Sequence, residues 1–225
     1  MTPRVTLESQ QIDFFFKHQR IEFEEVFSSQ AMDLLLAHLE EEVRRSLGKK
    51  PMDLATNQEL WMAGRVLLSN PSIQKPLFRS CLGTVASSLF RQKLLRLAYG
   101  QCLFTESSFD EPMAQEETLE EISSISPIVG GALICLSDTS KDPQNPLPIP
   151  FHQKKGSLLF FSAKYPIPFH ELFIQEKSRY LLLCFSTAAM RYRVTPKDPQ
   201  THLFKKLGYG SGDLIQEQIA PYFPS

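Results

Sequence analysis

The order of the sequence patterns predicts an α+β fold, in which a jelly-roll core is flanked by N-terminal helices. Helical patterns fill the first part of the chain, and short apolar runs typical of strands follow between residues 128 and 185. No βαβ alternation is visible, which argues against a parallel, doubly wound sheet. The 225 residues fit one domain, with a helical layer over about 1–100, jelly-roll strands over about 101–200 and a helical tail over about 201–225.

The clearest helical pattern runs from about Ala31 to Leu47. Ser28 can cap its N-terminus and Gly48 can end it. One face of this helix is apolar, because three residues recur at four-residue spacing: Leu35, Leu39 and Val43. The pattern predicts a helix that packs on a core.

Two further helical regions follow. Thr56 and Glu59 have the spacing of a capping box ahead of an apolar run, and Asn70-Pro71 can open the next helix. Residues Leu77 to Leu89 then keep an i+4 apolar spacing, and Gly100 is expected after the last turn. These helices would cover one side of the strands.

The apolar runs at Ile128–Leu136, Ser157–Phe161 and Tyr180–Phe185 predict strands. Each run is apolar on both alternating faces, as expected for strands that are covered on both sides. Prolines between residues 143 and 150 exclude regular structure from the connecting loop. Leu214–Ala220 again has a helical texture, and the glycines at 208, 210 and 212 predict a tight turn.

Composition excludes several classes of function. The formal net charge is −1, so no bulk field attracts nucleic acid or an anionic membrane. The four cysteines form no C-x-x-C pair, which favours buried, reduced thiols over a zinc or dithiol site. The N-terminus lacks the apolar core of a signal peptide, and no apolar run approaches the ~20 residues that span a bilayer. We expect a cytoplasmic protein.

Several segments, in this order, resemble the phytanoyl-CoA dioxygenase-like branch of the Fe(II)/2-oxoglutarate oxygenases. Ile12–His18 is similar to the first helix of that family, Asn145–His152 to its "G-x-L-x-x-I-P-G-S-H" loop and Gly156–Phe161 to its "G-D-x-x-x-F" strand. His170 stands where the family has its distal iron ligand. Arg179 stands where it has the arginine that pairs with the 2-oxoglutarate carboxylate. The resemblance implies a double-stranded β-helix (jelly-roll, cupin-like) core.

The same resemblance reveals a gap in the metal site. These enzymes hold Fe(II) with two histidines and one carboxylate, and an H-x-D pair supplies two of the three ligands. Here the corresponding region reads Ser123-Ser-Ile-Ser126, which places Ser124 and Ser126 at the ligand positions. Serine is a poor Fe(II) ligand, so we expect a degenerate iron site with no cofactor. His170, Arg179, Ser124 and Ser126 are the candidates for a relict pocket, and His170 is the metal ligand if a metal binds.

Each candidate also has a simpler interpretation. His170 can be a turn residue that hydrogen-bonds to nearby backbone, and Arg179 can form a surface ion pair with Glu171 or Glu176. Two functions remain open. The first is a catalytically inactive binding or interaction module, whose partner is a small anion or a protein rather than nucleic acid or a membrane. The alternative is a divergent Fe(II)/2-oxoglutarate-dependent oxygenase, or another enzyme that uses the same pocket.

Overall fold

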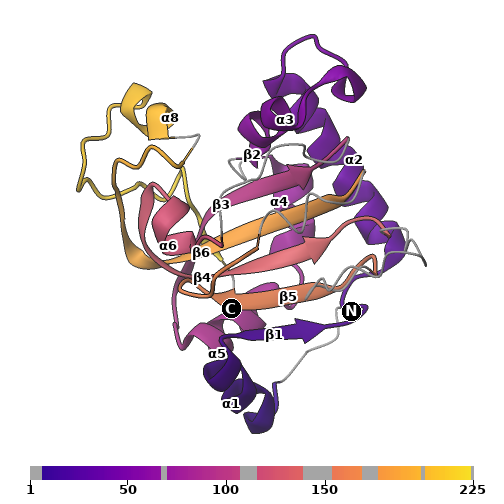
Figure 1. Ribbon diagram of the computed structural model, residues 1–225. Helices are drawn as coiled ribbons and strands as arrows, with labels where there is room; N and C mark the ends of the chain where they lie inside the picture. Colours follow the sequence, from indigo (N-terminus) through magenta and orange to yellow (C-terminus); the bar gives the residue numbers. More distant parts are fainter. Residues whose placement is uncertain are drawn as a thin grey trace.

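A seven-stranded antiparallel sheet forms the centre of the protein (Figure 1). The computed structural model describes residues 7–66, 70–106, 116–138, 154–168, 177–198 and 201–223. The strands are β1 (Arg20–Phe23), β2 (Arg65–Val66), β3 (Leu95–Phe104), β4 (Ile125–Cys135), β5 (Leu158–Ser162), β6 (Arg179–Tyr192) and β7 (Tyr222–Phe223). Their order is β1-β5-β4-β6-β3-β2, and β7 also pairs with β3.

The helices begin where the sequence provides capping residues. They are α1 (Ser9–His18), α2 (Ser29–Ser46), η1 (Met52–Leu54), α3 (Asn57–Ala63), α4 (Pro71–Phe78), α5 (Leu82–Phe90), α6 (Leu119–Ile122) and α8 (Thr201–Lys206). Ser28 Oγ accepts a hydrogen bond from Ala31 N, and Thr56 forms the expected capping box with Glu59. Asn70 caps α4, whose first residue is proline. These predictions are confirmed.

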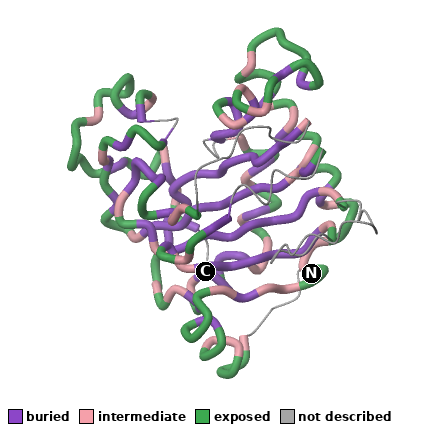
Figure 2. The backbone as a smooth tube through the Cα atoms, in the orientation of Figure 1, coloured by how far each residue is buried: buried purple, intermediate pink, exposed green. Residues whose placement is uncertain are grey.

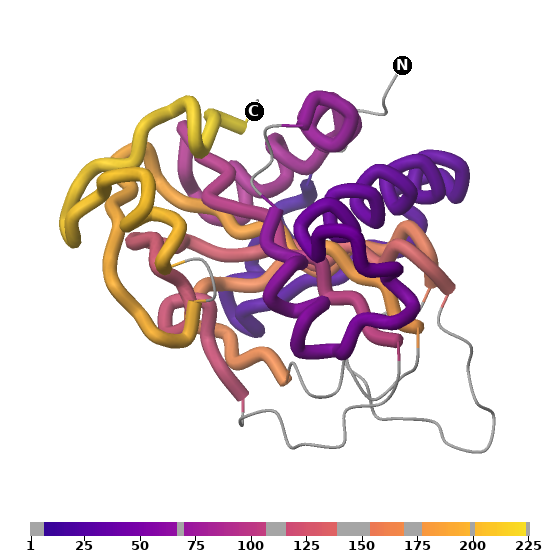
Figure 3. The backbone as a smooth tube through the Cα atoms, turned by 90° about the horizontal axis from the view of Figure 1, so that it is seen from above, coloured from indigo at the N-terminus to yellow at the C-terminus, as the bar shows by residue number. Residues whose placement is uncertain are grey.

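The sheet is buried on both faces (Figure 2). Along β6, Leu181 and Leu183 join an apolar cluster with the N-terminal helices, whereas Leu182 and Cys184 join a second cluster on the other side. We call these the helix-covered face and the opposite face. In Figure 3, α2 and the α4–α5 pair lie on the same side of the strands. The prediction of strands covered on both sides, with helices as one covering layer, is confirmed.

Leu95–Phe104 corrects the reading of the first hundred residues as helical. This segment is strand β3, and every residue in it is buried. Gly100, expected just after a helix, pairs with Leu183 of β6 in the ladder. The predicted helix is also broken between Phe78 and Leu82. Strands β1 and β2 lie in the same part of the chain, so the N-terminal region supplies part of the sheet as well as its cover.

The predicted helix at Leu214–Ala220 is also wrong. Leu214 instead forms a β-bridge with Arg191. The guanidinium of buried Arg96 donates hydrogen bonds to Ile215 O at 2.8 Å and to Ala220 O at 2.7 Å. The start of the segment is hydrogen-bonded to β6 instead of to a helical turn, because Ile215 N donates to Met190 O at 3.1 Å and Tyr192 N donates to Asp213 O at 2.9 Å. The glycine segment before it does form turns, as predicted, with positive φ at 208 and 212.

The described strands form an open sheet with β1 and β2 at its edges, rather than a closed barrel. The fold is therefore α+β with an antiparallel sheet.

All four cysteines are free, and three of them are buried, as expected. Within the described ranges, no helix is both long and apolar enough to cross a membrane.

Candidate functional site

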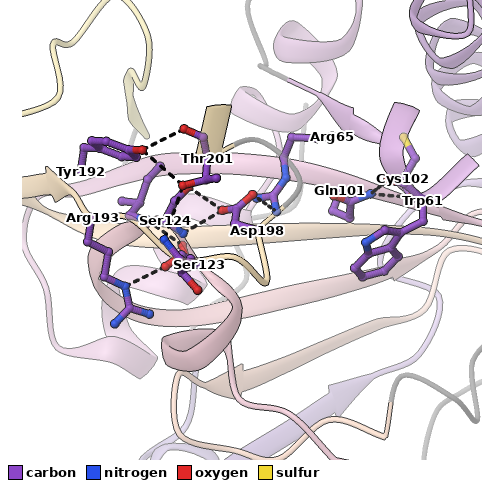
Figure 4. A network of polar contacts seen from close by, with 12 residues as sticks. Trp61, Arg65, Gln101, Cys102, Ser123, Ser124, Tyr192, Arg193, Asp198 and Thr201 are labelled. Carbon is purple, nitrogen blue, oxygen red and sulfur yellow. Dashed lines mark hydrogen bonds and ion pairs between the residues drawn. The ribbon is translucent and has the colours of Figure 1, made fainter. Parts of the chain in front are cut away.

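A buried ion pair lies on the opposite face of the sheet, between the N-terminal half of the chain and the segment that follows β6. Arg65 Nη2 donates to Asp198 Oδ1 at 2.9 Å, and the two side chains are 4% and 1% exposed. Figure 4 shows the two side chains pointing toward each other. Arg65 is placed by β2, which pairs with β3, and Asp198 lies in the turn after β6. The pair therefore joins segments that are far apart in sequence.

Ser124 completes the hydrogen bonding of this carboxylate. Its backbone N–H and its hydroxyl both donate to Asp198 Oδ2, at 2.7 and 2.6 Å. The neighbouring chain is fixed by Arg193 Nε, which donates to Ser123 O at 2.8 Å. A buried charge requires several such partners, because burial removes the water that would otherwise solvate it. Asp198 is thus neutralised and hydrogen-bonded by the protein itself.

The aromatic ring of Tyr99 packs against the guanidinium of Arg65. The guanidinium carbon lies 3.6 Å from the ring centroid, a distance typical of a close cation–π contact. Burial raises the pKa of the Tyr99 hydroxyl, and it raises the pKa of the Cys184 thiol to about 12. Burial alone would lower the pKa of Arg65, yet Tyr99 and Asp198 outweigh it and leave this pKa above its ordinary value. At neutral pH the arginine is charged, and the phenol and thiol are protonated and poorly nucleophilic.

Gln101 adds polar atoms that are not all used. It is 1% exposed, and its Nε2 donates to the carbonyls of Trp61 and Cys102 at 3.0 and 3.1 Å. Gln101 Oε1 and Arg65 Nε are buried and have no hydrogen-bond partner among the described residues. Arg65 and Gln101 are paired in the β2–β3 ladder, so these atoms belong to neighbouring positions of the sheet.

Arg179, predicted as an anion-binding arginine, is engaged by acidic residues. Its Nη2 lies 2.5 Å from Glu106 Oε1 and its Nε 3.5 Å from Glu40 Oε1, with the side chain 12% exposed. Its Nη1 donates to Thr105 O at 2.7 Å. Glu40 belongs to α2, so the guanidinium points to the helix-covered side. Arg179 is thus ion-paired with Glu40 and Glu106 and mostly buried, whereas Glu171 and Glu176, the partners that the sequence suggested for a surface ion pair, lie outside the described residues.

The two predicted serines are not brought together with Arg179. Ser124 binds Asp198 on the opposite face, and Ser126 is half-buried in β4, where it pairs with Arg191. His170 lies outside the described residues, so its place beside a relict pocket stays a prediction. Neither Arg65 nor Asp198 was foreseen, because no local pattern marks two residues that meet only through the sheet.

The described residues do not fit an Fe(II) centre. They contain no group of three or more histidine, cysteine, aspartate or glutamate side chains arranged to hold a metal ion. At the positions matched to H-x-D stand two hydroxyls, and the hydroxyl of Ser124 is committed to Asp198. The nearby carboxylate is in turn committed to Arg65. Hydroxyl oxygens are weak ligands for Fe(II), which these enzymes bind through imidazole and carboxylate.

Neither a protein-family model nor a curated protein matches this chain. Several solved structures, by contrast, do match it. SnoK, a non-haem α-ketoglutarate-dependent carbocyclase from nogalamycin biosynthesis, aligns with a TM-score of 0.64 and 12% identity over 96% of both chains. CytC3 with Fe(II) and α-ketoglutarate aligns with a TM-score of 0.59 and 11% identity, over 83% of this chain and 80% of that one.

CT296 from Chlamydia trachomatis is also similar, with a TM-score of 0.50 and 19% identity over 83% of this chain and all of CT296. Identities this low establish the fold and leave the activity open. The resemblance seen in the sequence is confirmed at that level: the chain has an α+β fold similar to that of Fe(II)/2-oxoglutarate oxygenases.

Proposed function

We propose that this chain is a double-stranded β-helix protein of the oxygenase type that has lost iron binding and acts as a binding or interaction module. The ion pair of Arg65 with Asp198, closed by Ser124, carries the proposal. In this arrangement Asp198, whose carboxylate lies at the region matched to H-x-D, is bound by Arg65 and Ser124. An iron ligand must instead direct its lone pairs into a site that is open to the metal.

Two further observations support this function. The arginine at the keto-acid position, Arg179, is ion-paired with Glu40 and Glu106. A carboxylate ligand would have to displace at least one of these partners before it could bind. The protonated states of Tyr99 and Cys184 also leave no activated nucleophile in the polar cluster.

Anaerobic calorimetric titration of the whole chain with Fe(II), with 2-oxoglutarate and with both tests the proposal. We expect no stoichiometric binding of either ligand. Tight binding of both at one equivalent would overturn it. His170→Ala and His202→Ala form a matched pair of controls, since His202 is an exposed residue of α8. If both variants lose a similar part of the wild-type heat of Fe(II) binding, the metal binds adventitiously to histidines. If only His170→Ala loses heat, His170 belongs to an iron site.

A divergent enzyme is the second candidate, and the unused buried atoms Gln101 Oε1 and Arg65 Nε on the opposite face favour it. Buried polar atoms without partners each cost about 1–3 kcal/mol, a cost that a polar ligand could offset. Gln101→Leu should then abolish binding of a polar small molecule while the protein stays folded. Screening small amides, alcohols and carboxylic acids by thermal shift tests this. Equal shifts in wild type and Gln101→Leu would remove the support for this candidate.

A further inference from the structure

A pocket of about 450 Å³ opens on the helix-covered face, between α5 and the edge of the sheet where β1 pairs with β5 (Figure 1). Its walls are mainly apolar and come from β1 and the turn after it, from α5 and from β5: Phe23, Val26, Phe27, Val85, Leu158 and Phe160. All six side chains belong to the apolar cluster of this face or pack against it. A pocket of this size with apolar and aromatic walls is typical of a small-molecule site.

The pocket lies on the other side of the sheet from the polar cluster. Phe160 of β5 belongs to the apolar cluster of the helix-covered face, whereas its neighbours Leu159 and Phe161 belong to the cluster of the opposite face. Successive side chains of a strand point to opposite faces, so the sheet separates this pocket from the ion pair of Arg65 with Asp198. A ligand here would be independent of the proposed function, which concerns the opposite face.

Local contacts hold the walls in place. Phe23 packs edge-to-face on Phe160, with ring centroids 6.2 Å apart. Phe27 N donates to Gly156 O at 3.2 Å, which ties the turn after β1 to the chain before β5. Gly156 has a φ of +84°, and a Cβ there would lie 2.4 Å from Phe27 O, so the close approach requires glycine. Walls that are ordered before binding lose little conformational entropy when a ligand enters.

The charged side chains of the lining lie at the rim of the pocket or point away from it. Glu24 and Glu25 are exposed, and Glu25 forms an ion pair with Lys154. Glu22 precedes Phe23 in β1, so its side chain points to the opposite face. The lining, all of which the structure describes, thus places no charge among the apolar walls. A charged ligand group would lose its water there without gaining a partner, which favours an uncharged ligand.

Two uncharged polar side chains complete the lining, Ser80 and Cys81. Ser80 Oγ donates to Leu77 O at 2.5 Å and accepts from Leu82 N at 3.3 Å, so the backbone satisfies this hydroxyl. Burial raises the pKa of the half-buried Cys81 thiol, which is therefore protonated at neutral pH and at most a weak hydrogen-bond donor. Recognition in this pocket therefore depends on shape and on apolar contact.

We propose that this pocket binds an uncharged aromatic small molecule. Three phenylalanine rings line it, and ring–ring contacts stabilise an aromatic ligand beyond the area that it buries. Phe23, Val26 and Phe27 are only partly buried by the protein itself, so a ligand would remove further apolar surface from water. Several segments of the chain enclose the pocket, an arrangement that suits a compact molecule better than a flat protein surface.

Fluorescence titration of the whole chain with N-phenylnaphthylamine, an uncharged aromatic probe that brightens in apolar surroundings, tests the pocket. We expect saturable binding of one equivalent, at least tenfold tighter than that of anilinonaphthalene sulfonate, which carries an anionic group on the same ring system. Val85→Phe should weaken binding of the uncharged probe at least tenfold, because the larger side chain fills the pocket. Ser88→Phe is the matched control, since Ser88 is an exposed residue of the same helix, and it should bind as wild type.

Cys81 provides a second readout that locates the probe. It is the one cysteine of the four that is not buried, so phenylmaleimide should label it first in the folded protein, as mass spectrometry can follow. Bound N-phenylnaphthylamine should slow this labelling at least threefold in wild type and leave it unchanged in Val85→Phe. Cys81→Phe fills the pocket from a half-buried position, and its fluorescence titration replaces that of Val85→Phe if the latter does not fold.

Three results would overturn the proposal. The first is binding that does not saturate, or that Val85→Phe or Cys81→Phe leaves unchanged. The second is equal affinity for the anionic probe. The third is a Cys81 that stays equally reactive when the probe is bound. If the fluorescence instead falls as the chain associates with itself at higher concentration, a second copy covers the pocket and the small-molecule assignment is wrong.

Discussion

Replacing Asp198 with alanine should reduce the free energy of unfolding by about 3–5 kcal/mol, the usual cost of leaving one buried charge without its partner. Arg65 and Asp198 have side chains only 4% and 1% exposed, so water cannot take over the lost contact unless the site opens. Ser124 at the same time loses the acceptor for both its N–H and its hydroxyl. The effect should therefore lie toward the upper end of this range.

Guanidinium denaturation measures this loss, and a thermal melt should show a Tm lower by roughly 6–20 °C, at ~2–4 °C per kcal/mol for a chain of this size. Arg65→Met alone should also destabilise the protein. The double variant should lose less than the sum of the two, with a coupling energy above about 1 kcal/mol, because the second substitution removes a charge that is already unpaired.

The exposed pair Glu41–Arg44 provides the control. Its side chains are 56% and 50% exposed, so Arg44→Met should change stability by no more than about 1 kcal/mol. A loss below about 1 kcal/mol in Asp198→Ala, or strict additivity of the two buried substitutions, would refute the view that this ion pair holds the C-terminal part of the chain to the sheet.

Three other outcomes are expected. Gly156→Ala should cost about 1–3 kcal/mol in denaturant unfolding, since φ is +84° and a Cβ there would lie 2.4 Å from Phe27 O; a neutral variant would contradict that close approach. Thr56→Ala removes the capping box of α3 and should cost about 1 kcal/mol by the same assay, and no loss would show that the cap is dispensable. Burial raises the pKa of the Cys135 and Cys184 thiols to about 12, whereas unfolded thiols ionise near pH ~8.5. Unfolded chains therefore hold fewer protons above that pH, and stability should fall by up to about 1.4 kcal/mol per pH unit for each thiol. Cys184→Ala should flatten this slope, and an unchanged slope would contradict the assignment.

The sequence was sufficient for elements whose signals are local. Capping residues predicted the starts of α2, α3 and α4, and three two-sided apolar runs predicted β4, β5 and β6. β3 was missed because it follows the helical spacing of α5 directly and carries Arg96 and Gln101 among its apolar residues. Both polar side chains are buried and find partners from distant segments. Strand preference depends on such neighbours more than on local propensity.

The polar cluster was hidden for the same reason. Asp198 stands in a short turn beside Lys197 and Pro199, where an aspartate usually indicates only a turn. Nothing local shows that its carboxylate is buried against Arg65, more than a hundred residues earlier in the chain. Ser124 was singled out for the ligand that it replaces, and the structure gives it a different role as a hydrogen-bond donor.

The pairing of β3 with β6 has a consequence for synthesis on the ribosome. β3 is complete long before β6 is made, because both β4 and β5 lie between them in the chain. Until β6 arrives, the main ladder partner of β3 is missing, and Tyr99 and Leu103 lack the later residues that cover the opposite face. Folding should be slow and largely post-translational, as is typical of folds dominated by long-range contacts. The nascent N-terminal half should accordingly be a strong client of chaperones that bind exposed apolar segments.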